Sequence, residues 1–163
     1  MEAAYAALLQ KAPDHEEIHF NVAHLMARTG RTNEAIAHYE TALKLLPNYA
    51  DAHNNLGNLL VRQKKYDEAI THFEAALQVT DNDSSIYNNL GTALASSGRL
   101  AEAIPNFARA AQLNPDYAEA WFNLGRSALS LGRIDEAIPA LETAAKLRPD
   151  LAPAMRTLEQ AKQ

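Results

Sequence analysis

Asparagine recurs every 34 residues along this chain of 163 residues. The members of the series are Asn21, Asn55, Asn89 and Asn123. Asparagine disfavours helices, so its return within segments that otherwise look helical indicates that each side chain has a compensating partner. A carboxamide carries a donor and an acceptor, and these match the two groups of a peptide bond. A ladder of such amides could therefore hold an extended polypeptide by its backbone.

The histidines give weaker support for a metal site than the asparagines give for peptide binding. His15 and His19 are four residues apart and could share a metal ion. However, His15 falls in a turn between helices and His19 falls at a packing position, which favours packing. His38 and His72 occupy equivalent places 34 residues apart, and we expect both to face solvent.

Enzymatic chemistry has no clear set of residues. The neighbouring carboxylates at 67–68 and 135–136 stand at expected helix starts, where they complement the helix dipole. The serines and threonines lack a nearby His–Asp set, so no catalytic triad is indicated. The chain has no cysteine, which excludes thiolate nucleophiles, thiolate metal sites and disulfides. We expect a protein that is no enzyme and carries no cofactor.

The spacing of 34 residues extends over the whole chain and marks it as a repeat protein. The full units are 16–49, 50–83, 84–117 and 118–151. We number positions within a unit from 1, so that residue 16 is position 1. All six glycines fall at position 8 or position 15. Every unit has alanine at positions 20 and 27, and larger apolar residues at positions 7, 21 and 24.

This pattern predicts two helices in each unit. Helix A covers roughly positions 2–14, because glycine at position 15 favours a helix end. Helix B covers roughly positions 18–30, since proline at position 32 stops it. Asn or Asp at position 33 is expected to cap the next helix A. Small residues at positions 8, 20 and 27 let the helices of a pair approach closely, and the pairs must stack because neither helix buries its apolar face alone.

The two ends look like half units. Residues 1–15 match a helix B without its helix A, and residues 152–163 match a helix A that would cap the stack. We therefore expect ten helices in a single domain, 1–163. The start in the middle of a repeat suggests a piece of a longer protein. Pro105 and Pro139 fall near the starts of their helices B, so we expect no break there.

Composition supports an all-α fold and excludes some partners. Hydrophobic residues make up 47% of the chain but aromatic residues only 7%, which favours close-packed helices over sheets. The net charge of −5 gives no electrostatic footprint for nucleic acid. No apolar stretch is long enough to span a membrane. The N-terminus lacks the features of a signal peptide, which favours the cytoplasm over secretion.

The repeat resembles the tetratricopeptide repeat (TPR) over essentially the whole chain. Unit 118–151 carries the closest match. Its matching residues are Trp121, Leu124, Gly125, Ala137, Ala144 and Pro149. It departs from the family at Ala128 and Leu141. The resemblance implies a right-handed α-solenoid, in which helices A line a concave groove that binds proteins or peptides.

Under this resemblance the asparagine series at position 6 faces the groove. The series is similar to that in the TPR superhelix of O-GlcNAc transferases, which implies contacts to a peptide backbone. The expected peptide-binding residues are Asn21, Asn54, Asn55, Asn58, Asn88, Asn89, Asn123 and Arg126. Alternatively, each asparagine of the series bridges neighbouring helices A and only shapes the superhelix.

One TPR subclass grips the acidic C-terminal tails of chaperones with a two-carboxylate clamp. At the clamp positions, counted from unit 50–83, this chain has Asn54, Asn58, Asn89, Glu119 and Asn123. The clamp's cations are missing and Glu119 would repel a carboxylate. This function is therefore not expected.

Three functions remain open. The first is a protein–protein interaction module that binds an extended peptide segment of a partner. The second is a scaffold that self-associates into a homo-oligomer, with Trp121 and Phe122 among the contacts. The third is the substrate-presenting arm of a larger enzyme such as a glycosyltransferase, which the start in mid-repeat motivates.

Overall fold

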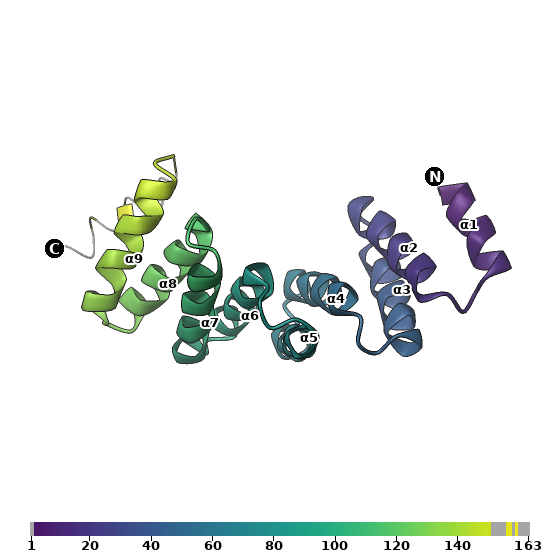
Figure 1. The fold of residues 1–163 in the computed structure, drawn as a ribbon, viewed down its shortest axis with the longest axis horizontal. Helices are drawn as coiled ribbons and strands as arrows, with labels where there is room; N and C mark the ends of the chain where they lie inside the picture. The colour runs from purple at the N-terminus through teal and green to yellow at the C-terminus, as the bar shows by residue number, and fades with distance from the viewer. Residues whose placement is uncertain (1, 151–155, 158, 160–163) are drawn as a thin grey trace. The chain divides into compact units, whose positions relative to one another are not determined.

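The computed structural model describes residues 2–150, 156–157 and 159 of the chain (Figure 1). Over these residues it contains nine α-helices and no strand. The helices are α1 (Glu2–Lys11), α2 (Glu16–Arg28), α3 (Thr32–Leu45), α4 (Ala50–Arg62), α5 (Tyr66–Val79), α6 (Ser84–Ser96), α7 (Leu100–Leu113), α8 (Ala118–Ser130) and α9 (Ile134–Leu147). The predicted all-α architecture of stacked helix pairs is confirmed.

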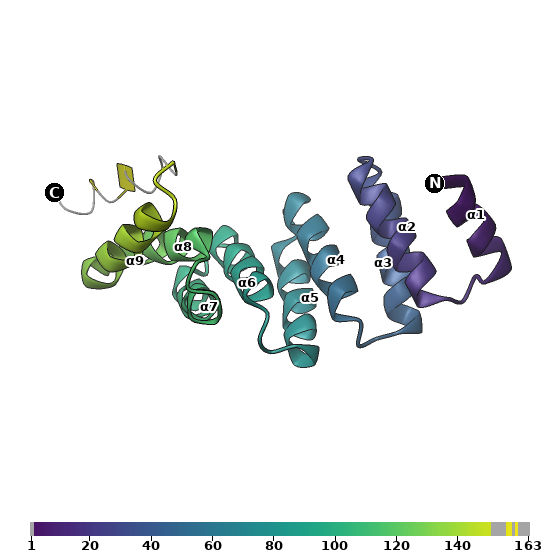
Figure 2. The same ribbon diagram turned by 45° about the horizontal axis from the view of Figure 1, so that its top comes forward.

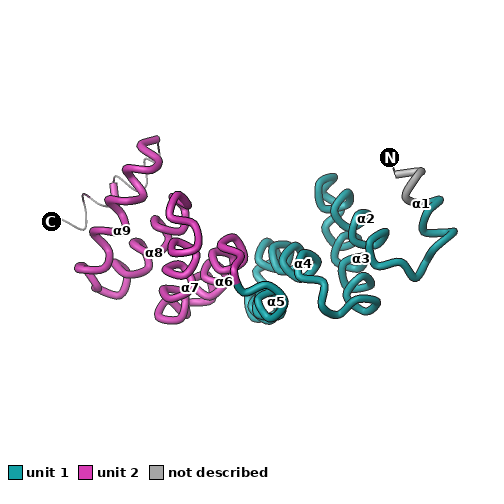
Figure 3. Tube along the Cα trace, viewed as in Figure 1, with its two compact units in different colours: residues 1–81 teal, residues 82–163 magenta. Residues whose placement is uncertain are grey.

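The chain forms two compact units (Figure 3). Unit 1 is Met1–Asp81 and holds α1 to α5, while unit 2 is Asn82–Gln163 and holds α6 to α9. In unit 1, α2 packs on α3 and α4 packs on α5, and α3 joins the two pairs by contacting α4 (Figure 2). In unit 2, α6 pairs with α7 and α8 pairs with α9, and α7 contacts α8. That all four repeats form a single domain stays a prediction.

The predicted helices match the observed ones closely. Helices α2, α4, α6 and α8 are the helices A of the four repeats, and each occupies positions 1–13. Helices α3, α5, α7 and α9 are the helices B and occupy positions 17–30. Helix α1 lies within residues 1–15, and that it is the helix B of a partial repeat stays a prediction. The tenth helix, expected over 152–163, lies almost wholly outside the described residues. Helices α7 and α9 run through Pro105 and Pro139 without a break.

Position 15 ends helix A through a left-handed backbone. Gly30, Gly98 and Gly132 have φ values of 81°, 86° and 72°. In the repeat that lacks this glycine, Lys64 adopts the same conformation with a φ of 61°. The geometry of this turn is therefore kept even where a side chain makes the left-handed region less favourable.

The predicted N-caps at position 33 are wrong. In α4, α6 and α8 the N-cap residue stands one place later, at position 34, because position 33 lies in the preceding turn. Asp83 fills this place in α6, and its carboxylate accepts the backbone N–H groups of Ser85 at 2.8 Å and Ile86 at 3.3 Å. Tyr49 and Tyr117 fill it in α4 and α8, where no side chain caps the helix.

The core follows the repeat positions. All eight alanines at positions 20 and 27 have no exposed surface. The large residue at position 24 packs on the glycine at position 8, because a Cβ added to Gly57 would lie 2.7 Å from the Phe73 ring. Gly91 and Phe107 are related in the same way. The expected role of small residues in bringing helices A and B together is thus confirmed.

Candidate functional site

Positions 6, 9 and 13 of each helix A lie on one face, because their spacing of three and four residues matches the helical turn. We call this stripe the helix-A face. On α4 it consists of Asn55, Asn58 and Arg62. In unit 1 these three side chains line a cleft of about 400 Å³ between α2, α3 and α4. The other lining residues are His24, Ala27, Arg28, Tyr39 and Leu59.

Asn55 is tied to the core of unit 1. Its side chain hydrogen-bonds the hydroxyl of Tyr39, which comes from α3 and is 1% exposed. Burial raises the pKa of Tyr39 to about 12, and the hydrogen bond from Asn55 opposes that rise. A carboxamide that makes one such bond keeps capacity for a second partner. Asn55 can therefore be both positioned by the protein and offered to a ligand.

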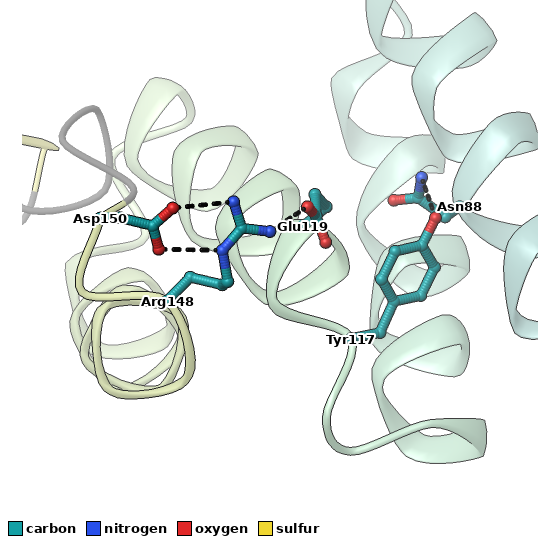
Figure 4. Close-up of polar contacts among 5 residues, drawn as sticks. All are labelled: Asn88, Tyr117, Glu119, Arg148 and Asp150. Atoms are coloured by element: carbon teal, nitrogen blue, oxygen red, sulfur yellow. Dashed lines mark hydrogen bonds and ion pairs between the residues drawn. The ribbon is translucent and has the colours of Figure 1, made fainter.

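In unit 2 the amides contact one another. Asn88 is only 7% exposed, and its Nδ2 donates to the Tyr117 hydroxyl at 3.2 Å (Figure 4). Its Oδ1 accepts Nδ2 of Asn123 at 3.0 Å, which joins α6 to α8. This contact between neighbouring helices A is of the kind that the alternative reading of the asparagine series expects.

The remaining predicted site residues lie at or near the surface. Four of them, all asparagines, are half-buried: Asn21, Asn54, Asn58 and Asn89. Arg126 is exposed, with its guanidinium carbon 5.7 Å from the centre of the Phe122 ring. It also lines a cleft of about 340 Å³ in unit 2, together with Ser96, Ser127 and Ser130. That these side chains contact a peptide stays a prediction.

Arg148 was not foreseen as a polar centre of unit 2. Its guanidinium lies between two carboxylates (Figure 4). It donates to Glu119 at 3.0 Å and to Asp150 at 3.0 and 3.1 Å. Glu119, which was expected to repel an incoming carboxylate, is thus partly neutralised by Arg148. The clamp for acidic tails still lacks its cations.

The expectation that His38 and His72 face solvent is wrong. Both are half-buried, and each contacts the histidine at position 4 of the same repeat. Nδ1 of His38 lies 3.0 Å from Nδ1 of His19, and Nδ1 of His72 lies 2.9 Å from Nδ1 of His53. Burial, followed by the charge of the neighbouring histidine, lowers the pKa of His38 and of His72. The pairs were detectable in the sequence, because histidine occupies positions 4 and 23 together in the first two repeats.

Packing of His19 at position 4 is confirmed. Its Nε2 lies 2.8 Å from the carbonyl oxygen of Pro13, and Trp121 donates its indole N–H to Pro115 in the same way at 2.9 Å. The histidine therefore replaces the donor that tryptophan supplies at this position. Within the described part of the chain, no group of three or more His, Asp or Glu side chains is placed to hold a metal ion. None of the described helices combines the length and apolar character needed to cross a bilayer.

Comparison with known proteins identifies the repeat. Two family models described as tetratricopeptide repeat match the chain, one over residues 14–82 and 48–113 and the other over residues 88–152. No curated protein matches.

Solved structures with similar folds include two at 26–27% identity. YrrB, described as a TPR protein with an unusual peptide-binding site, is 27% identical, with a TM-score of 0.87 over 97% of this chain and 81% of its own. MamA is 26% identical, with a TM-score of 0.85 over 90% of this chain and 80% of its own. Pseudomonas aeruginosa pilF is 22% identical, with a TM-score of 0.78 over 90% of this chain and 67% of its own, and shows the likeness of fold alone.

Proposed function

The chain belongs to the tetratricopeptide repeat family, and from that premise we propose that it is a protein–protein interaction module that binds an extended peptide segment. The segment lies along the helix-A face of α4 in unit 1, where the amides of Asn55 and Asn58 pair with its backbone. The likeness of the asparagine series to that of O-GlcNAc transferases is part of this proposal.

The observation that carries the proposal is the cleft of unit 1. It has a volume of about 400 Å³ and is lined by Asn55 and Asn58, two residues that the resemblance to the tetratricopeptide repeat assigned to the groove. Asn55 is held in place by Tyr39, so little side-chain entropy is lost when it binds a ligand. YrrB, the relative with a peptide-binding site, covers 97% of this chain, which adds a precedent within the same fold.

The test is selection of binding peptides from a random library of 12-residue peptides displayed on phage. The wild-type chain should enrich a set of sequences, whose affinities are then measured by fluorescence anisotropy with synthetic copies. Asn55→Ala/Asn58→Ala should weaken them by about 10-fold or more, since each lost hydrogen bond to a peptide group contributes about 1 kcal/mol and the cleft loses two. A matched control is Asn106→Ala, which changes a half-buried amide on α7 that donates to the carbonyl oxygen of Glu102 in the same helix and does not line the cleft.

Two results would contradict the proposal. One is the failure of the wild-type chain to enrich any peptide. The other is equal affinity of the enriched peptides for the wild type and for Asn55→Ala/Asn58→Ala, when circular dichroism shows the variant to be folded.

A further inference from the structure

The cleft of unit 1 is a cationic site on an acidic protein. The chain has a net charge of −5, yet Arg28 and Arg62 both line this cleft. Among the described residues that line it, none is an aspartate or a glutamate. Arg28 comes from α2 and Arg62 from α4, so two successive repeats each supply one guanidinium. The cleft thus concentrates positive charge where the rest of the chain is mostly negative.

These two arginines differ from five other cations of the protein, which form ion pairs. Arg31, Arg99, Arg133 and Lys65 each form an ion pair with the glutamate three residues further on. Arg148 pairs with Glu119 and Asp150. Neither Arg28 nor Arg62 forms an ion pair with any residue that the structure describes. Their charge is available to a ligand, while the charge of the five cations in these ion pairs is already compensated.

A local structural role does not account for this arrangement. Arg28 and Arg62 stand in the last turns of α2 and α4, where a cation complements the helix dipole. Helices α6 and α8 have serine at the same position, Ser96 and Ser130, and have the same length. A cation at position 13 is therefore not needed to form helix A. Its presence in the first two repeats alone points to the cleft that these two residues share.

We propose that the cleft of unit 1 binds the carboxylate of an aspartate or glutamate side chain in the partner's segment. The inference rests on the proposed function and names the kind of partner that unit 1 selects. Guanidinium groups match a carboxylate because their N–H donors form paired, charge-assisted hydrogen bonds. Asn55 and Asn58 add amide donors, and Ala27 and Leu59 offer apolar surface to the methylene groups of the acidic residue. The acidic side chain is an anchor, and the amides hold the backbone beside it.

The experiment uses the same phage library of random 12-residue peptides. Peptides enriched by the wild type should share an Asp or Glu at a fixed place. A synthetic copy should lose about 10-fold or more in affinity for the Arg28→Gln/Arg62→Gln variant, as expected when charged hydrogen bonds are removed. The same loss should follow from changing the peptide's Glu to Gln, and the two losses should not add. Arg31→Gln, which removes a cation already paired with Glu34, is the matched control and should leave affinity unchanged.

The outcomes separate the two claims. Enriched peptides without a shared acidic residue would overturn the inference, as would equal affinity for the wild type and for Arg28→Gln/Arg62→Gln. In either case the proposed peptide binding stands. Failure to enrich any peptide would instead overturn the proposed function, and the inference with it. A synthetic peptide with phosphoserine in place of the acidic residue must bind no more tightly, because tighter binding would assign the cleft to phosphate.

Discussion

Nδ1 of His53 lies 2.9 Å from Nδ1 of His72, and the ring centroids are 5.2 Å apart. The contact joins α4 to α5 within one repeat. Nε2 of His53 lies 3.0 Å from the carbonyl oxygen of Pro47, so Nε2 carries the proton and donates it. Nδ1 of His53 must then accept, and Nδ1 of His72 must donate. A fully protonated pair would bring two N–H groups face to face.

Acidification is therefore expected to destabilise the protein through His38 and His72. The pKa of each is lowered in the folded chain, mainly by burial, so the unfolded chain binds these protons more readily. Among the charged neighbours of His38, His19 and Arg31 lower its pKa, while Glu34 raises it. The stabilisation is complete above the unfolded pKa of about 6.5 and is lost as pH falls below it.

Urea unfolding at a series of pH values from 7.5 to 5 measures this effect. The free energy of unfolding of the wild type should fall over that range. In His38→Asn/His72→Asn the same curve should be flatter, whatever the variant's stability at pH 7.5. Parallel curves for the two proteins would contradict the prediction.

Gly91→Ala should destabilise unit 2 by overpacking. The added Cβ would lie 2.7 Å from Cε1 of Phe107, a ring with no exposed surface. The expected loss is about 1–3 kcal/mol in the free energy of unfolding, read from urea denaturation. Gly98→Asn is the matched change at the end of the same helix. Its site has a φ of 86° and open space around it, and asparagine tolerates that backbone. If Gly98→Asn lowered the free energy of unfolding more than Gly91→Ala, close packing of the ring on position 8 would not be what requires glycine there.

Most of the fold could be predicted from the sequence because each repeat position has one physical task. The alanines at positions 20 and 27 are all fully buried, and the left-handed glycines at position 15 end their helices. The N-cap of α6 was misplaced because its turn offers three polar residues in a row, at 81–83, and only the backbone decides which one caps. Asp83 and not Asn82 caps α6 for that reason.

The site was harder to predict because its key contacts join different elements. The repeat pattern singled out Asn55, and the family resemblance added Asn58, but neither could show that Arg28 and Arg62 share their cleft. Nor could it show that Tyr39 holds Asn55. Each of these contacts crosses from one helix to another, so it depends on side-chain directions that spacing along one helix does not contain.

Alkaline pH should destabilise unit 1 through Tyr39. Its pKa is raised to about 12, chiefly because burial disfavours the phenolate. The unfolded chain loses this proton near pH 10, so the stabilisation is complete below about pH 10 and is lost as pH rises toward 12. Thermal unfolding between pH 9 and pH 11.5 should show a falling midpoint for the wild type and a shallower fall for Tyr39→Phe. Equal slopes would mean that Tyr39 ionises in the folded protein as it does in the unfolded one.

The amides of the two units should separate into structural and ligand-facing groups. Asn123→Ala removes the donor that Oδ1 of Asn88 accepts, and Asn88 is only 7% exposed. The buried oxygen then loses its partner, which should cost about 1–3 kcal/mol in the free energy of unfolding. Asn58→Ala, on the wall of the unit 1 cleft, should change that free energy by less than about 0.5 kcal/mol. Peptide affinity should fall more for Asn58→Ala than for Asn123→Ala, because Asn58 lines the cleft while Asn123 hydrogen-bonds Asn88 of α6. The prediction fails if Asn123→Ala and Asn58→Ala reduce the free energy of unfolding equally and have equal peptide affinity. Both amides would then have the same structural role.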